Sequence, residues 1–88
     1  MAVYKVTFKK SVLKDLDSIA SGEIKKILAC IDTLAVNPRA EGCIKLSGKE
    51  QYRIRRGLYR IIYEIQDDAL VVLVIKVGHR ASVYRGGS

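Results

Sequence analysis

The 88-residue chain has few of the residues that build metal centres, disulfide frameworks or membrane spans. It contains one histidine and no tryptophan, and its two cysteines, Cys30 and Cys43, lack the spacing of metal ligands. The longest apolar run, residues 69–75, is far too short to cross a bilayer, and no secretory signal precedes the first predicted strand. We therefore expect a reduced, cytoplasmic protein with no metal, no cofactor and no membrane partner.

Acidic residues are also in the minority. Sixteen Lys and Arg against nine Asp and Glu give a net charge of +7 and a pI near 9.7, which favours a polyanion or an acidic partner. Arginine dominates the cations from Lys49 onward: Arg53, Arg55, Arg56, Arg60, Arg80 and Arg85. The planar fork of arginine binds oxyanions in pairs, so the second half of the chain is expected to hold an anion site.

The periodicity of the apolar residues predicts one domain over residues 1–88. A strand is expected over residues 2–8, helices over 9–20 and 21–36 with Ser21 as N-cap, a short extended piece over 43–46, a hairpin over 52–65 and a last strand over 69–77. This β-αα-β-β-β order is typical of an α+β fold, with a mostly antiparallel sheet and the N-terminal helical hairpin packed on one face. The last strand is apolar on both faces and is predicted to be central.

The predicted hairpin carries arginines on one face. With a two-residue turn at Arg56-Gly57, Arg53 lies opposite Arg60. One face then holds Tyr52, Ile54, Tyr59, Ile61 and Tyr63, which we expect to pack on the helices, and the other holds Arg53, Arg55 and Arg60. Because like charges opposite one another destabilise a sheet, this pattern indicates an anion-binding face. His79 and Arg80 follow the last strand and are expected in the same neighbourhood.

Several motifs together resemble the RelE branch of the RelE/ParE toxin superfamily, over nearly the whole chain. They are Asn37-Pro38-Arg39, Lys45-Leu46-Ser47-Gly48, the tyrosine-flanked arginine hairpin, and Val77-Gly78-His79-Arg80 with Val83-Tyr84. The resemblance implies the toxin of a toxin–antitoxin pair, which enters the ribosomal A site and cuts mRNA there. It also implies a RelB-like antitoxin that wraps around the toxin.

The resemblance assigns catalytic positions to Arg53, Arg55, Arg60, Arg80 and Tyr84. Tyr84 is expected to stack on a base, a contact worth about 1–3 kcal/mol, although packing against the sheet is the alternative. Lys49, Arg56 and Arg85 are expected to bind RNA.

Metal-independent cleavage requires attack by the 2′-OH on the phosphorus, with one group to take a proton and another to give one. The arginines stay charged, because their pKa lies above about 12, so they suit charge stabilisation and not base catalysis. His79, with an ordinary pKa of about 6.5, is a candidate general acid, with Arg80 as the other candidate donor; a capping or positioning role for His79 is equally open. Lys49 and Glu50 are open as general base.

Two other functions fit the same fold. A ParE-like toxin would inhibit DNA gyrase by binding, but chains of that type lack the full set of basic residues and tyrosine found here. A basic binding module would hold an acidic antitoxin or RNA without turnover. The sequence favours a metal-independent endoribonuclease, an mRNA interferase.

Overall fold

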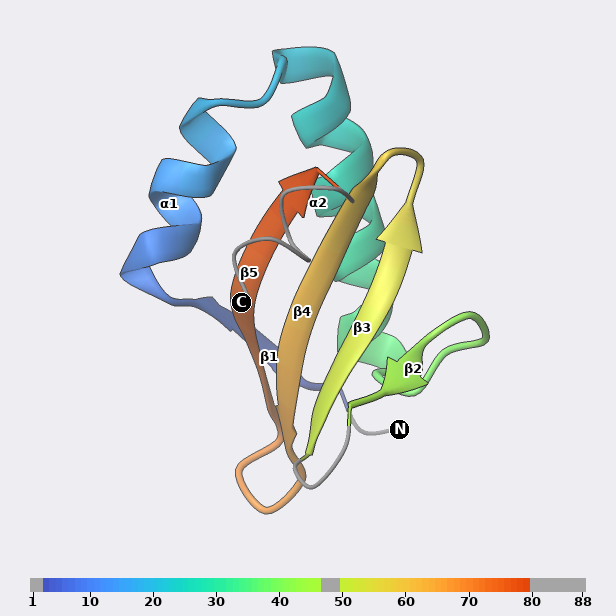
Figure 1. Ribbon diagram of the computed structural model, residues 1–88. Coiled ribbons are helices and arrows are strands. Elements are labelled where there is room, and N and C mark those ends of the chain that lie inside the picture. Colours follow the sequence, from blue (N-terminus) through green and yellow to red (C-terminus); the bar gives the residue numbers. More distant parts are fainter. Residues whose placement is uncertain (1–2, 47–49, 80–88) are drawn as a thin grey trace.

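A computed structural model describes residues 3–46 and 50–79 of the chain (Figure 1). In chain order the elements are β1 (Lys5–Phe8), α1 (Lys10–Asp17), α2 (Ser21–Val36), β2 (Ile44–Lys45), β3 (Gln51–Arg56), β4 (Tyr59–Gln66) and β5 (Val71–His79). The predicted succession of a strand, two helices and then strands is confirmed, but the order is β-αα-β-β-β-β, because the short extended piece expected over 43–46 pairs with β3 as a strand of its own, β2.

The strands form one sheet in the order β1-β5-β4-β3-β2. All neighbours are antiparallel except β1 and β5, which run parallel. Helix α1 packs on β5, and α2 packs on β1 and β3, behind the sheet in Figure 1. The α+β prediction is thus confirmed, and the last strand is an interior strand as predicted, flanked by β1 and β4, although β4 and not β5 is the middle strand.

Several element boundaries differ from the predicted ones. Helix α1 ends at Asp17, and Ile19 turns into the core from the connection to α2, where its side chain is buried. Ser21 is the first residue of α2 and not its cap, since Ala20 occupies the N-cap position without a side-chain hydrogen bond. β5 runs to His79, two residues further than expected.

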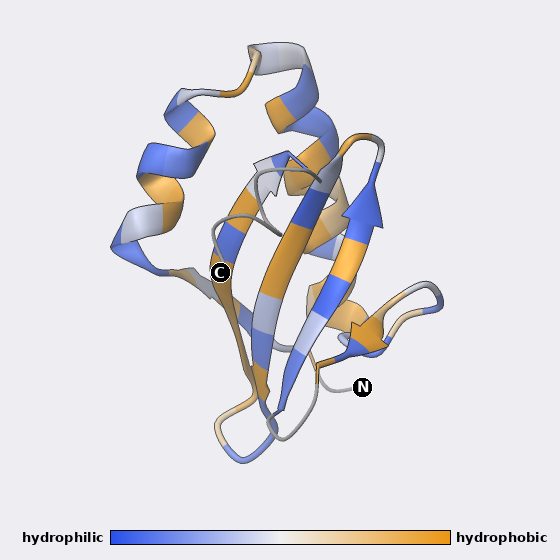
Figure 2. Ribbon diagram, viewed as in Figure 1, coloured by the Kyte–Doolittle hydropathy of each residue, from blue (hydrophilic) through white to orange (hydrophobic). Residues whose placement is uncertain are grey.

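The core lies between the helices and one face of the sheet (Figure 2). Its fully buried side chains are Val12, Ile27, Ile31 and Leu34 from the helices and Ile61, Tyr63, Val72, Val74 and Val77 from the strands. Tyr52 and Tyr63 stack with ring centroids 5.9 Å apart, which confirms their predicted core role, and Tyr59 packs against the same cluster while partly buried. Cys30 and Cys43 are free thiols that also contact the core. No helix in the described part of the chain is long and apolar enough to cross a bilayer.

Candidate active site

The hairpin of β3 and β4 turns at Gly57-Leu58, one residue later than predicted. Its pairing places Arg55 opposite Arg60 and Arg53 opposite Ile62, so the predicted pairing of Arg53 with Arg60 was wrong. Gly57 has a φ of 60°, a left-handed conformation that suits glycine at the first position of a two-residue hairpin loop. The register moves by two residues as a result, and a shift of two leaves every side chain on its predicted face.

Arg53, Arg55 and Arg60 therefore share the face of the sheet that points away from the helices; we call it the arginine face. The side chains that alternate with them and are buried on the other side are Tyr52, Ile54, Ile61 and Tyr63. Arg55 is exposed and Arg53 is half-buried, whereas Arg60 is only 3% exposed. Residues directly opposite on an antiparallel pair have Cβ atoms about 5 Å apart, so the side chains of Arg55 and Arg60 leave the sheet next to one another.

Arg56 belongs to the opposite side of the hairpin. It pairs with Tyr59 at the end of β3, on the face that packs against the helices. Arg56 and Tyr59 line a groove of about 530 Å³. The other residues that line it are Glu23 and Lys26 of α2 and the loop residues Gly57 and Leu58. The structure thus separates Arg56 from the arginine face, and its contact with RNA stays a prediction.

His79 ends β5 at the same end of the sheet as Arg55, but its register places it on the helix-facing side. It pairs with Tyr59, and the two rings meet edge to face with centroids 5.9 Å apart. A β-bulge in β5 explains this placement. It lies between Val74 and Lys76, which pair with Tyr63 and Ile62 of β4. One extra residue inverts the alternation of the strand, so the side chain of His79 points away from the arginines. A general acid must reach the leaving oxygen, so this geometry favours the positioning role over proton donation.

The remaining predicted site residues lie outside the described part of the chain. These are Lys49, Arg80, Tyr84 and Arg85. Their catalytic and RNA-binding roles stay predictions. Within residues 3–46 and 50–79, no three His, Cys, Asp or Glu side chains gather in a way that could hold a metal ion.

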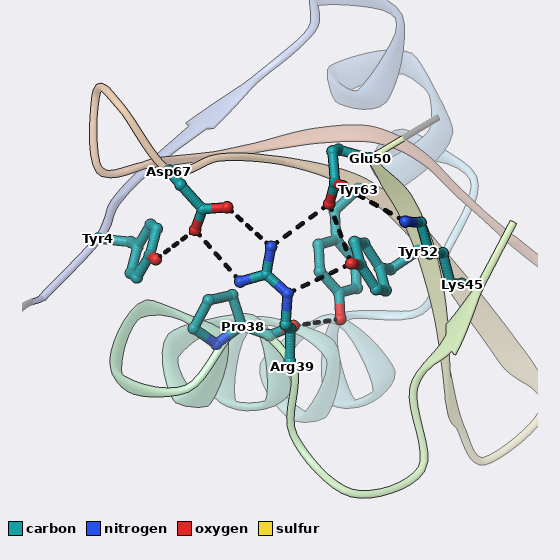
Figure 3. A network of polar contacts seen from close by, with 8 residues as sticks. All are labelled: Tyr4, Pro38, Arg39, Lys45, Glu50, Tyr52, Tyr63 and Asp67. Atoms are coloured by element: carbon teal, nitrogen blue, oxygen red, sulfur yellow. Dashed lines mark hydrogen bonds and ion pairs between the residues drawn. The ribbon is translucent and has the colours of Figure 1, made fainter. Parts of the chain in front are cut away.

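The other end of the sheet carries a polar network that the sequence did not reveal (Figure 3). Arg39 donates two hydrogen bonds to the Asp67 carboxylate, at 3.1 and 2.8 Å, and a third to Glu50 at 3.3 Å. It also donates to the Tyr52 hydroxyl, which in turn donates to Glu50 at 3.0 Å. Tyr4 donates to Asp67 at 2.6 Å. The network therefore ties β3, the β4–β5 turn and the segment before β1 to the loop after α2.

Glu50 is thereby a poor candidate for the general base. Hydrogen bonds from Tyr52 and then Lys45 lower the pKa of its carboxyl. It also precedes β3, whereas the pairing of Arg55 with Arg60 lies at the far end of that strand. A carboxylate so stabilised, at the wrong end of the hairpin, serves the fold and not proton transfer at the arginine face.

The Asp67 carboxylate should make stability depend on pH in a defined window. Hydrogen bonds from Arg39, and next from Tyr4, lower its pKa to about 2, below the value of about 3.9 of an unfolded Asp. A lowered folded pKa means that the stabilisation is complete above the unfolded pKa and is lost as the pH falls toward 2. The effect will be modest, because both side chains are about half exposed and are screened by solvent.

Thermal unfolding of the wild type and Asp67→Asn between pH 2 and 6 measures this effect. We expect the wild type to have the higher Tm at pH 5 to 6 and the difference to vanish near pH 2. Because both proteins share the other carboxyl groups, the difference between their Tm values reports on residue 67. A difference that stays constant down to pH 2 would contradict the assignment.

Comparison with known proteins places the chain. The sequence model of the family described as ParE toxin of type II toxin-antitoxin system, parDE, matches residues 6–84. The toxin RelE3 of Methanocaldococcus jannaschii is 35% identical over 86 residues, covering 91% of this chain and 94% of that protein.

Solved structures agree with this match. The isolated E. coli RelE toxin superposes with a TM-score of 0.77 at 29% identity, over 96% of this chain and 94% of that one. The toxin–antitoxin complex RelBE of E. coli matches with a TM-score of 0.76 at 29% identity, over 86% and 95%. These findings confirm the resemblance drawn from the motifs. The chain belongs to the ParE toxin family of type II toxin–antitoxin systems, and within it to the RelE branch.

Proposed function

We propose that this toxin is a ribosome-dependent endoribonuclease that cuts mRNA in the A site and so inhibits translation. The observation that carries the proposal is the pairing of Arg55 with Arg60 on a face that also holds Arg53. Three guanidinium groups on one side of a rigid hairpin form a site for a phosphodiester, because each can bind phosphoryl oxygens through two parallel hydrogen bonds. Strands hold such groups more firmly than loops do.

In the proposed reaction the 2′-oxygen forms a bond to phosphorus and the bond from phosphorus to the 5′-oxygen breaks. A base takes the 2′ proton, and an acid gives a proton to the 5′-oxygen that leaves. The arginine face stabilises the negative charge that grows on the phosphoryl oxygens, and one such donor is typically worth a factor of about 10²–10³ in rate. Arginine provides this charge at every physiological pH.

Residues beyond the arginine face complete the proposed site. Arg80 follows His79 in sequence and is the preferred proton donor, since His79 faces the helix side of the sheet. Tyr84 stacks on a base of the bound codon. Lys49 and Arg85 contact the RNA backbone through charge alone.

The partner that we propose is a RelB-like antitoxin. The E. coli structure that matches this chain is a complex of RelE with RelB, and the two toxins share the fold over 95% of the E. coli chain. The net charge of +7 makes an acidic partner favourable. The antitoxin and the ribosome with its mRNA are thus the two partners of the chain.

One observation favours a second function. The matching family model is described by the name ParE, and ParE-like toxins inhibit DNA gyrase without cutting RNA. That function does not require an arginine pair across a hairpin, so it leaves the pairing of Arg55 with Arg60 unexplained.

Induction of the chain in cells, followed by primer extension on an abundant transcript, separates these functions. We expect growth arrest, with cuts confined to translated frames and lost in Arg80→Ala. Growth arrest with intact mRNA and a DNA-damage response would instead indicate gyrase inhibition. Absence of arrest would leave a binding module, and it would overturn the proposal.

A further inference from the structure

The outer edge of β5 loses its strand partner halfway along. Pairing with β1 covers Val71 to Val74 and ends at Phe8, and the Lys9 amide adds one bond of 3.0 Å to the Val74 carbonyl. The chain then turns into α1 at Lys10. Among the described residues no strand flanks residues 75–79 of β5 on that side.

Asp15 of α1 occupies the place of the missing strand. Its Oδ2 accepts a hydrogen bond of 3.3 Å from the Val77 amide, and its Oδ1 lies 3.7 Å from Nζ of Lys76. The Asp15 side chain is 20% exposed, and Val77 is 1% exposed. An amide buried so deeply needs an acceptor, and a carboxylate is a stronger one than a carbonyl. Asp15 therefore continues the hydrogen bonding of the β5 edge beyond the end of β1.

The segment held in this way determines the geometry of the candidate site. Val77, Gly78 and His79, which we call the β5 tip, pair with Ile61, Arg60 and Tyr59 of β4. The bulge next to the tip interrupts the regular ladder between β5 and β4. The tip is thus separated from the part of β5 that β1 supports. A cavity of about 200 Å³ between α1 and the tip, lined by Asp15, Ser18 and His79 among others, leaves room for the tip to move.

We propose that Asp15 is a positioning residue of the candidate site. It fixes the β5 tip against β4 and so holds Gly78 beside Arg60. The acceptor oxygen of Asp15 does this, and the ion pair with Lys76 is secondary, because it is long and both its groups reach solvent. The expected effect of Asp15 on cleavage rests on the proposed function, whereas its effect on the position of the β5 tip does not.

Three variants test the proposal. Asp15→Ala removes the acceptor, Asp15→Asn keeps an oxygen for the Val77 amide but removes the charge, and Lys76→Ala removes only the ion pair. Amide hydrogen exchange measured by NMR reports on the tip directly, with the Val72 amide in the β1-supported part of β5 as internal reference. We expect Asp15→Ala to lower protection at Val77 by roughly tenfold or more relative to Val72, because a hydrogen bond to a charged group is lost. Asp15→Asn should recover most of it, and Lys76→Ala should change little.

Single-turnover cleavage on programmed ribosomes gives the second readout. Asp15→Ala should slow the cleavage step by roughly tenfold at saturating ribosomes, while the concentration for half-maximal rate stays unchanged, since misplacement acts on chemistry more than on binding. Asp15→Asn should restore the rate.

Distinct results would overturn each part. Equal losses of protection at Val77 and Val72 would show that Asp15 only stabilises the whole fold, and failure of Asp15→Asn to recover protection would assign the effect to charge. If the wild type cuts no RNA but the tip amides respond as expected, the proposed function fails and the structural role of Asp15 stands. If the tip responds and cleavage does not, the catalytic consequence is wrong.

Discussion

Replacing Arg55 with alanine is expected to lower single-turnover RNA cleavage by about 10²–10³-fold, the usual cost of one preorganised donor to a developing oxyanion. Arg55 pairs with Arg60 across the hairpin, so its loss removes one of the three guanidinium groups of the arginine face. Its side chain is exposed, and the substitution should leave stability nearly unchanged.

The neighbouring Arg56→Ala is a matched control. It removes the same charge from the next residue of the same strand, but from the helix-facing side. We expect its single-turnover rate at saturating ribosomes to stay within about threefold of the wild type, because a predicted contact with RNA would contribute to binding and not to the cleavage step. Similar losses in both variants would show that net charge matters and that the arginine face does not. If both variants cut RNA as fast as the wild type, Arg55 is not part of the site.

Tyr63→Ala should have the largest effect on stability. Tyr63 is fully buried, stacks on Tyr52 and donates a hydrogen bond of 2.6 Å to the Pro38 carbonyl. Removal of a buried aromatic ring costs about 3–5 kcal/mol, a large share of the roughly 5–15 kcal/mol that stabilises a domain. Urea denaturation at neutral pH measures this loss.

Two companion variants separate packing from hydrogen bonding. Tyr63→Phe keeps the ring and leaves the Pro38 carbonyl unsatisfied, which should cost about 1–3 kcal/mol. Leu58→Ala removes a side chain that is mostly exposed in the hairpin loop, so its effect should stay within about 0.5 kcal/mol. If Tyr63→Ala is no worse than Leu58→Ala, the Tyr63 ring does not hold the core in the way described.

The arginine face was predictable from sequence because strand alternation has a period of two. The expected turn was misplaced by one residue and the register by two, yet Arg53, Arg55 and Arg60 still shared a face. The tyrosines were predictable for the same reason. Such an error leaves each side chain on its predicted face, but it changes which residue lies opposite each arginine.

The position of His79 was not predictable, because it depends on one bulge. A bulge inserts a residue without a distinctive sequence signal, and in β5 all the residues near it are apolar or lysine.

Asp15 was missed for another reason. Among the lysines of α1 it looks like an ordinary surface charge, and only the end of β1 gives it a buried amide to bind. Arg39 was likewise visible only as part of a motif, since its partners lie 11 and 28 positions away.

The parallel pairing of the first and last strands affects how the chain folds during synthesis. Lys5 pairs with Val71, 66 positions later, so β1 has no strand partner in this sheet until β5 has left the ribosomal exit tunnel. Loop closure over such a distance is slow compared with hairpin formation. The β3–β4 hairpin with its arginines is therefore synthesised first, and the sheet that holds it is completed only after β5 has left the exit tunnel. A growing toxin chain thus carries its cations well before it has a folded site.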